Sequence, residues 1–201
     1  MKINSNLFLL FAAFFAACNS STPKEEKPKV ETFNSKELGW TIEIPTGFKS
    51  LSQNRVRENE LKGKAALDSS TTEKAPSSEL KHIINFQKNQ FNSFTATILP
   101  YDERIDGDYL KSNQITKEAI YDAYTLQKIK VDTASFQETI AGKMFLGFSI
   151  KIYGPNGDVI MNQLLMTQLR NGYDFGININ YNNEADRNTL FDALHHSKFS
   201  N

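Results

Sequence analysis

The sequence predicts an α+β domain built on a mostly antiparallel sheet. Apolar and polar residues alternate along several short runs, as they do in strands that bury one face. Most of these runs follow one another across short turns, which is how antiparallel strands are joined. Helix-like segments are interspersed among runs of adjacent strands and do not alternate with single strands, which disfavours a doubly wound parallel sheet.

The first predicted strand spans residues 39–45. Trp40, Ile42 and Ile44 alternate with polar residues, and Pro45 ends the run. Residues 53–67 have the composition of a helix with a loose apolar stripe, although a glycine weakens its middle. The polar residues 68–78 are expected to form a loop.

A hairpin is predicted next. Its strands are residues 82–88 and 93–99, and residues 89–92 form a four-residue loop. After a charged loop at residues 101–108, a helix is expected over residues 113–127. Its broad apolar face consists of Ile115, Ala119, Ile120, Ala123, Tyr124 and Leu126.

The remainder is predicted to be mostly strand. A short strand at 136–140 is followed by strands at 144–153, 159–169 and 173–181, with a final helix from about Asn183. Glycine-containing turns separate the strands. In strand 144–153, the residues expected to share one face are Met144, Leu146, Phe148, Ile150 and Ile152.

The alternating runs identify residues that should be largely buried, because each lies on the apolar face of its strand. They are Trp40, Ile42, Ile44, Phe86, Phe94, Phe148, Ile150, Phe175, Ile177 and Ile179.

The chain begins with an apolar run that ends at its only cysteine. Residues 7–17 follow a short polar start that carries Lys2, and they are too few for a membrane-spanning helix, which needs about 20 residues. Residues 15–18, Phe-Ala-Ala-Cys, resemble the lipobox of a bacterial lipoprotein, in which the cysteine is lipidated and becomes the first mature residue. We therefore predict a signal peptide over residues 1–17 and lipidation at Cys18. The alternatives are an ordinary secretory signal and a buried apolar segment.

Residues 18–37 are predicted to be a flexible tether. They are polar and show no sustained helical or strand period, so they cannot bury enough apolar area to offset the entropy of ordering. An acidic signal close behind the lipidated cysteine exports Bacteroidetes-type lipoproteins to the outer surface, but Glu25 and Glu26 lie further away among lysines and are interpreted as solvated charges. The domain, residues 38–201, is thus expected in the cell envelope, anchored by lipid at the periplasmic face of a membrane or at the outer surface.

Charge and cysteine content narrow the possible partners. Basic and acidic residues both number 23, and removal of residues 1–17 takes away Lys2 and leaves a net charge of about −1. This balance gives no reason to expect nucleic acid or a polybasic contact with anionic lipid. A single cysteine cannot form an intramolecular disulfide.

Five segments resemble the Mog1/PsbP-like superfamily, particularly its exported bacterial lipoprotein members, and the resemblance covers nearly the whole of residues 38–200. They are GWTIEIPTGF at 39–48, the hairpin at 82–102, TKEAIYDAY at 116–124, IAGKMFLGFSIKIYG at 140–154 and YDFGININYNNEADRNTLFDAL at 173–194. The resemblance implies an antiparallel sheet of about six strands sandwiched by helices. Founding members bind other proteins, a small GTPase in one case and a photosystem complex in another, but none of their contact residues can be matched to positions here.

Catalytic, metal and cofactor motifs are not found in the sequence. It contains no GxSxG, P-loop, HExxH, CxxC or glycine-rich dinucleotide turn, so no catalytic residue and no cofactor is predicted. His195 and His196 are adjacent on a predicted helix and point about 100° apart, which does not suit one metal ion. His82 opens a strand and is expected at the surface.

An acidic loop and the tyrosines leave two alternatives open. Asp102, Asp106 and Asp108 flank Gly107 much as in a calcium loop, but the 12-residue pattern with its terminal glutamate is missing, so a solvated loop is expected. The seven tyrosines could form a sugar-binding platform, although packing in strands and helices explains four of them.

Two functions follow from these observations. The favoured one is a non-catalytic module, anchored to a membrane, that binds an envelope protein with one face or edge of its sheet. The alternative is a carrier or receptor for a small or apolar ligand, or a sugar, held between sheet and helices. A carrier should contain a closed apolar pocket of several hundred cubic ångströms, on the order typical of ligand sites. An interaction module should be solid inside and expose an apolar patch.

Overall fold

The computed structural model describes residues 30–52 and 80–200. The expected signal peptide (1–17), Cys18, most of the expected tether, the expected helix at 53–67 and the loop at 68–78 lie outside the described residues. Among the described residues, no helix is long and apolar enough to span a membrane. The architecture is α+β and antiparallel, which confirms the predicted fold class.

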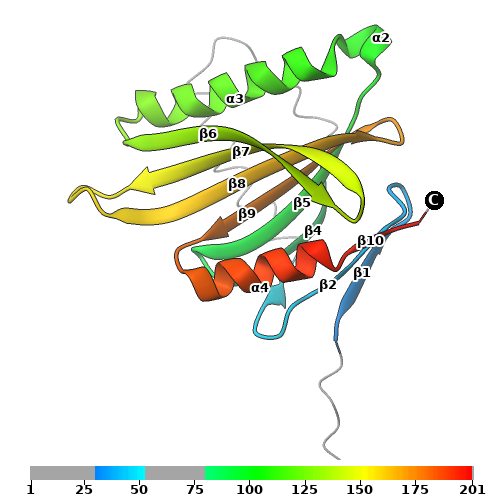
Figure 1. The fold of residues 1–201 in the computed structure, drawn as a ribbon, viewed down its shortest axis with the longest axis horizontal. Helices are drawn as coiled ribbons and strands as arrows, with labels where there is room; N and C mark the ends of the chain where they lie inside the picture. The colour runs from blue at the N-terminus through cyan, green and yellow to red at the C-terminus, as the bar shows by residue number, and fades with distance from the viewer. Residues whose placement is uncertain (1–29, 53–79, 201) are drawn as a thin grey trace, which may run out of the picture.

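A seven-stranded antiparallel sheet forms the centre of the domain (Figure 1). In spatial order its strands are β3 (Lys49–Ser50), β4 (Lys81–Asn89), β5 (Asn92–Pro100), β9 (Tyr173–Tyr181), β8 (Val159–Arg170), β7 (Lys143–Tyr153) and β6 (Val131–Ile140). A smaller sheet contains β1 (Thr32–Ser35), β2 (Trp40–Glu43) and β10 (Lys198–Phe199). The helices are α2 (Glu103–Asp106), α3 (Tyr109–Leu126) and α4 (Glu184–His195). Figure 1 shows α3 on one side of the large sheet, and α4 with the smaller sheet on the other.

The main core lies between the large sheet, the smaller sheet and α4. Trp40 is fully buried at its centre, and its ring centroid lies 5.0 Å from that of Phe175 and 6.3 Å from that of Phe94. The ten residues predicted to be buried are all buried, so this prediction is confirmed.

A second apolar cluster lies between α3 and the opposite face of the sheet. Phe148, Ile150 and Ile152 of β7 pack there against Ile120 and Tyr124 of α3. The inward stripe of α3 is narrower than predicted, because the helix contacts the sheet along one side only. Three residues placed in the apolar sets by sequence are exposed: Ile115 (55%), Leu126 (62%) and Met144 (59%).

The structure corrects several predicted boundaries. β6 starts at Val131 instead of residue 136, and α3 starts at Tyr109 because Asp108 caps it. The predicted four-residue hairpin loop is a two-residue turn, since Asn89 and Asn92 pair as the last residues of their strands. Part of the charged loop at 101–108 forms the short helix α2, and neither β3 nor β10 was predicted.

The N-terminal boundary of the domain also differs from the prediction. β1 lies within residues 18–37, which were expected to be tether, and it pairs with β2 in four successive positions. Phe33 of β1 packs edge-on against Trp40 with ring centroids 6.3 Å apart. The folded domain therefore includes β1, because the Phe33 side chain packs against the main core although the residues around it are polar.

α3 ends with a residue in the left-handed conformation. Lys128 has a φ of 58°, and the Lys128 and Ile129 amides donate to the carbonyls of Thr125 and Tyr124 in a Schellman arrangement. Glycine is the residue best suited to this left-handed position, so Lys128→Gly should raise the free energy of unfolding by about 1 kcal/mol. Urea unfolding measures the change. Lys128→Ala is the control and should give no such gain, because alanine keeps the Cβ atom; equal gains for both variants would contradict the explanation.

Candidate functional site

The acidic residues singled out in the sequence cap helices. Asp102 accepts from the Arg104 amide at 3.0 Å and pairs with its guanidinium, and Asp106 accepts from the Asp102 amide at 2.8 Å. Asp108 caps α3 through the Lys111 amide at 2.7 Å. In the described part of the chain, no group of three or more His, Cys, Asp or Glu side chains is arranged to hold a metal ion.

The histidines lie in separate environments. The His195 Nε2 atom is 3.4 Å from the Glu138 Oε1 atom of β6, whereas the His196 Nδ1 atom is 2.7 Å from the Asp192 carbonyl oxygen of α4. His82 lies in β4 opposite Thr97 of β5. The adjacent histidines therefore turn to different neighbours, as their helical spacing predicts.

The tyrosines brace separate parts of the fold. Tyr109 donates to the Asp174 carboxylate at 2.8 Å, and Tyr124 donates to Gln163 at 3.1 Å. Burial raises the pKa of Asp174, and Tyr109 is the hydrogen-bond donor that faces it. Tyr153 bonds to Asp132 at the other end of the sheet. Tyr109, Tyr124 and Tyr153 therefore have structural contacts at separate places, and Tyr101 packs edge-on against Tyr109 with ring centroids 5.4 Å apart.

Two clefts among the described residues bear on the carrier hypothesis. One, of about 200 Å³, is lined by residues of β1, β3 and β4 and their flanks, including Phe33, Ile44 and His82. The other, of about 300 Å³, lies between the end of α3 and the start of β6 and includes Tyr121 and Val131. Both are open to solvent and have mixed polar and apolar walls. Neither is the closed apolar pocket that the carrier hypothesis predicts.

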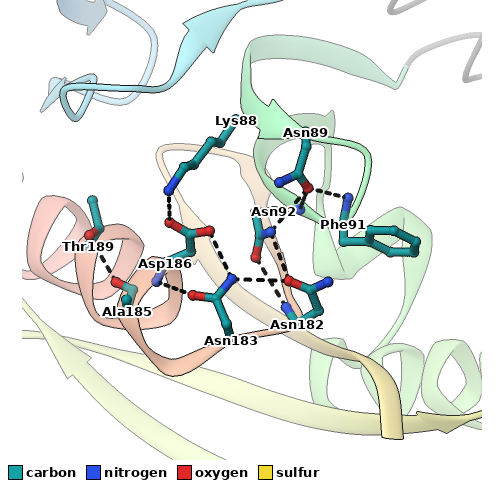
Figure 2. Close-up of polar contacts among 9 residues, drawn as sticks. All are labelled: Lys88, Asn89, Phe91, Asn92, Asn182, Asn183, Ala185, Asp186 and Thr189. Carbon is teal, nitrogen blue, oxygen red and sulfur yellow. Dashed lines mark hydrogen bonds and ion pairs between the residues drawn. The ribbon is translucent and has the colours of Figure 1, made fainter.

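An asparagine cluster ties the β4–β5 hairpin to the start of α4 (Figure 2). The Asn92 side chain is buried, and its amide donates to Asn89 at 3.0 Å and to Asn182 at 2.9 Å. The Asn182 backbone amide donates in return to Asn92 at 3.1 Å. Each of these Asn92 groups has a partner, so the cluster is a structural brace.

Lys88 and Asp186 extend this brace. The Lys88 ammonium lies 2.6 Å from the Asp186 carboxylate, which also accepts from the Asn183 amide at 2.9 Å (Figure 2). Lys88, and then Asn183, lower the pKa of Asp186 below its ordinary value of 3.8. A carboxyl group whose pKa is lower in the folded chain adds stability above its unfolded pKa, and this stability is lost as the pH falls through the folded pKa.

This linkage predicts a pH-dependent mutant effect. Lys88→Met should lower the free energy of unfolding at neutral pH, and its difference from wild type should shrink as the pH falls from about 4 towards 2. Urea unfolding at a pH of about 7, 4 and 2.5 measures this. Lys198→Met, in an exposed position of β10 opposite Thr41, is the control and should show no comparable trend. A Lys88→Met effect that stays constant over this range would contradict the assignment.

The exposed edge of the large sheet is the strongest candidate for a functional site. β6 pairs with β7 in ten consecutive positions, from Val131 with Ile152 to Ile140 with Lys143, without a bulge. No strand of the described residues pairs with its other side, and Figure 1 shows it as the outermost strand next to β7. The opposite edge strand, β3, has only two residues. β6 is therefore the longer of the two edges.

The hydrogen-bond register shows which backbone groups face outwards. The Tyr153 amide donates to the Lys130 carbonyl at 3.0 Å, and Ile140 and Lys143 enclose a two-residue turn whose residues, Ala141 and Gly142, both have positive φ. In such an antiparallel pair, alternate residues direct both backbone groups to the neighbouring strand. Even-numbered residues of β6 therefore bond to β7. The residues whose N–H and C=O groups point away from the sheet are Val131, Thr133, Ser135, Gln137 and Thr139.

This edge lacks the features that usually block strand addition. Natural edges are protected by proline, lysine, bulges or a covering segment. β6 has none of the first three, and the side chains from Asp132 to Ser135 are all exposed. Phe136 fixes the strand in place, because its ring packs over Gly147, where a Cβ atom would lie 2.4 Å from the ring. β6 is thus held firmly to the sheet, and no strand of residues 30–52 or 80–200 pairs with its outer side.

The sequence did not identify this site. Residues 131–135 show no alternation, because both faces of the strand are exposed there, so only 136–140 was predicted as strand. A long stretch with strand-forming residues and no lysine, proline or glycine was the available signal.

Comparisons with known proteins define the fold. No family model matches the chain, and no curated protein matches its sequence. Among solved structures, it is similar to the cyanobacterial PsbP protein, CyanoP, of Synechocystis sp. PCC 6803. The two share 9% sequence identity with a TM-score of 0.56, and the match covers 90% of this chain and 99% of the other. The similarity supports the Mog1/PsbP-like resemblance seen in the sequence, and the chain has a PsbP-like α+β fold.

Proposed function

We propose that this protein is a lipid-anchored, non-catalytic interaction module of the cell envelope, and that it binds an extended segment of another envelope protein along the outer edge of β6. The observation that carries the proposal is the row of outward-facing backbone groups on five residues of a bulge-free strand. A peptide can add to such an edge by main-chain hydrogen bonds, and this mode of recognition is common among protein-binding domains.

Two further observations support an interaction module. The described residues surround two apolar clusters, and the clefts lined by Phe33 and by Tyr121 are open to solvent. Large apolar side chains are exposed along α2 and α3, including Ile105 and Leu110. Where exposed apolar side chains form a contiguous patch, they mark contact sites in many proteins.

The alternative function, a carrier or receptor for a small or apolar ligand or a sugar, has one observation in favour of its sugar form. Buried side-chain oxygens of Asn85, Asn178 and Asn180 have no hydrogen-bond partner among the residues that the structure describes. The pairing of β4, β5 and β9 places these residues on one face of the sheet. Buried acceptors without donors are unfavourable and would suit a ligand rich in hydroxyl groups. We prefer binding at the β6 edge over the carrier function, because a strand can add to an edge without a cavity.

The lipid anchor has its own test. If Cys18 is lipidated, two or three acyl chains hold the protein firmly, because stable anchoring needs at least two lipid signals. The native chain should partition into detergent and carry a fatty-acid mass at Cys18. Cys18→Ser should leave an unprocessed or soluble species. An unmodified Cys18 thiol in an aqueous native chain would overturn this part of the proposal.

The edge can be tested in cells with a photo-crosslinking amino acid at Gln137, whose backbone faces outwards and whose side chain is exposed. We expect a discrete crosslinked product that is lost when Thr133→Pro is added, because this proline removes an outward N–H group that a partner strand needs. The same probe at Lys198 of β10, in the smaller sheet, is the positional control and should give no product. A Gln137 product that persists with Thr133→Pro would show that β6 does not add a strand there.

A further inference from the structure

We propose that the segment bound by the β6 edge carries a basic, an acidic and a second basic residue at spacings of three, in the pattern Lys/Arg-x-x-Asp/Glu-x-x-Lys/Arg. This inference rests on the proposed function and adds the chemistry of the partner. It follows from three charged side chains at the edge, Lys117, Asp132 and Glu138, and from the alternation of the strand.

Lys117 provides the central positive charge. Its ammonium group lies 3.4 Å from the Ser135 Oγ atom and 5.9 Å from the centre of the Phe148 ring. Burial lowers the pKa of Lys117, and no acidic side chain of the described residues pairs with it. Ser135 is the middle one of the five outward-facing residues. A carboxylate placed opposite Ser135 on this face would give Lys117 an ion-pair partner.

Asp132 and Glu138 provide the negative charges on the other face. They lie three residues before and after Ser135, so the strand alternation turns their side chains away from the α3 side. Asp132 accepts a hydrogen bond from the Tyr153 hydroxyl, and the Lys130 ammonium stacks on that ring 4.7 Å from its centre. The Glu138 carboxylate faces His195, which carries charge only when protonated. Among the described residues, neither carboxylate forms an ion pair with a lysine or arginine.

The residues of an added strand would lie opposite these three charges at fixed positions in its sequence. Its residue opposite Ser135 shares the face of Lys117, and its residues three positions away on either side share the face of Asp132 and Glu138. The successive charges of the partner are then about 10 Å apart along the strand. Because the pattern is symmetric, it has the same form in either chain direction.

A second copy of this chain does not meet these requirements. Antiparallel pairing of two β6 strands that uses all five outward-facing residues places Ser135 opposite Ser135. In that register Asp132 lies opposite Glu138 of the other copy, and this happens twice. Like charges in directly opposite positions destabilise a strand pair. A different protein with the complementary charges is therefore the expected occupant.

Synthetic peptides test the inference on the purified full chain. The matched probe is fluorescein-labelled Thr-Lys-Thr-Val-Asp-Val-Thr-Lys-Thr, and the inverted probe exchanges its charges to Thr-Glu-Thr-Val-Lys-Val-Thr-Glu-Thr. A third probe is the matched peptide with N-methyl groups on the second residue before and after the aspartate, where the amides would bond to β6 in antiparallel pairing. Fluorescence anisotropy gives the Kd of each.

We expect the matched peptide to bind at least tenfold more tightly than the inverted one, and the N-methylated peptide to lose binding. The charge-exchanged protein Lys117→Glu, Asp132→Lys, Glu138→Lys should prefer the inverted peptide. The unfolding of this triple variant is compared with that of the wild type. If the triple variant does not fold, the single variant Lys117→Gln replaces it, and we expect that variant to weaken the binding of the matched peptide only. Equal binding of both peptides that N-methylation abolishes would overturn the charge pattern and leave strand addition intact. Binding that N-methylation does not affect would contradict strand addition itself. If neither peptide binds, the charge pattern is overturned. Concentration-dependent dimers that form without peptide would identify a second copy of the chain as the occupant.

Discussion

Ala134→Pro is expected to lower the free energy of unfolding by about 3 kcal/mol, whereas Thr133→Pro, one residue earlier, should lower it by no more than about 1 kcal/mol. Ala134 lies opposite Ser149, and its backbone groups bond to β7; its carbonyl also accepts from the Ser149 hydroxyl at 3.2 Å. Proline there removes a hydrogen bond of the sheet and places its ring against the neighbouring strand. The Thr133 amide points outwards, so proline at this position removes an N–H group that forms no hydrogen bond with β7.

Urea unfolding followed by circular dichroism measures both variants. Because both residues lie in the same exposed stretch of β6, differences in burial cannot explain a large gap between them. Equal losses for the two variants would show that the deduced orientation of the β6 backbone is wrong. That result would also remove the basis for using Thr133→Pro to block strand addition.

Trp40→Ala is expected to produce the largest loss of stability, about 3–5 kcal/mol. Trp40 lies in the smaller sheet and contacts Phe94 and Phe175 of the large sheet and Phe199 of β10, with ring centroids 5.0–6.4 Å apart. Removing the indole would leave a large cavity where the two sheets meet, and a packed core cannot collapse to fill it completely.

Trp40→Phe is the matched control for this position. It keeps an aromatic ring and removes the Trp40 indole N–H group, which is buried without a hydrogen-bond partner among the described residues. Its loss should therefore be less than about half of that for Trp40→Ala. Trp40 is the only tryptophan, so circular dichroism must replace intrinsic tryptophan fluorescence. A Trp40→Ala loss below about 1 kcal/mol would mean that the two sheets do not depend on this contact.

Much of the fold could be predicted because it is encoded locally. The alternation in residues 173–181 depends only on which face of a strand meets the core, and β9 spans this range as predicted. The turn at Asn171 and Gly172 has positive φ at both residues, which these two residue types adopt readily. The final helix begins after Asn183, whose side chain accepts from the Asp186 amide as an N-cap. In each case the signal lies within a few neighbouring residues.

The candidate site could be predicted only in outline. The sequence indicated binding through a face or an edge of the sheet, but it could not show which strand would be the edge, because strand order results from pairing between distant segments. β6 is next to β7 in the chain and in space, and its other side lacks a partner among the described strands because β8, β9 and β5 all lie beyond β7. The position of Lys117 beside Ser135, on the face opposite Asp132 and Glu138, likewise depends on where α3 crosses the sheet.

The sequence by itself determined the α+β class, the buried faces of the strands and most of the turns, because burial period and turn chemistry are local properties. It also carries the predicted signal peptide and the lipidation of Cys18, which lie outside the described residues. Only the tertiary structure decided the order of the seven strands, the inclusion of β1 and β10, the narrow stripe of α3 that meets the sheet, and the outward direction of the odd-numbered residues of β6. These features depend on contacts between segments far apart in the chain, and an exposed edge strand leaves no pattern of burial in its sequence by which it could be recognised.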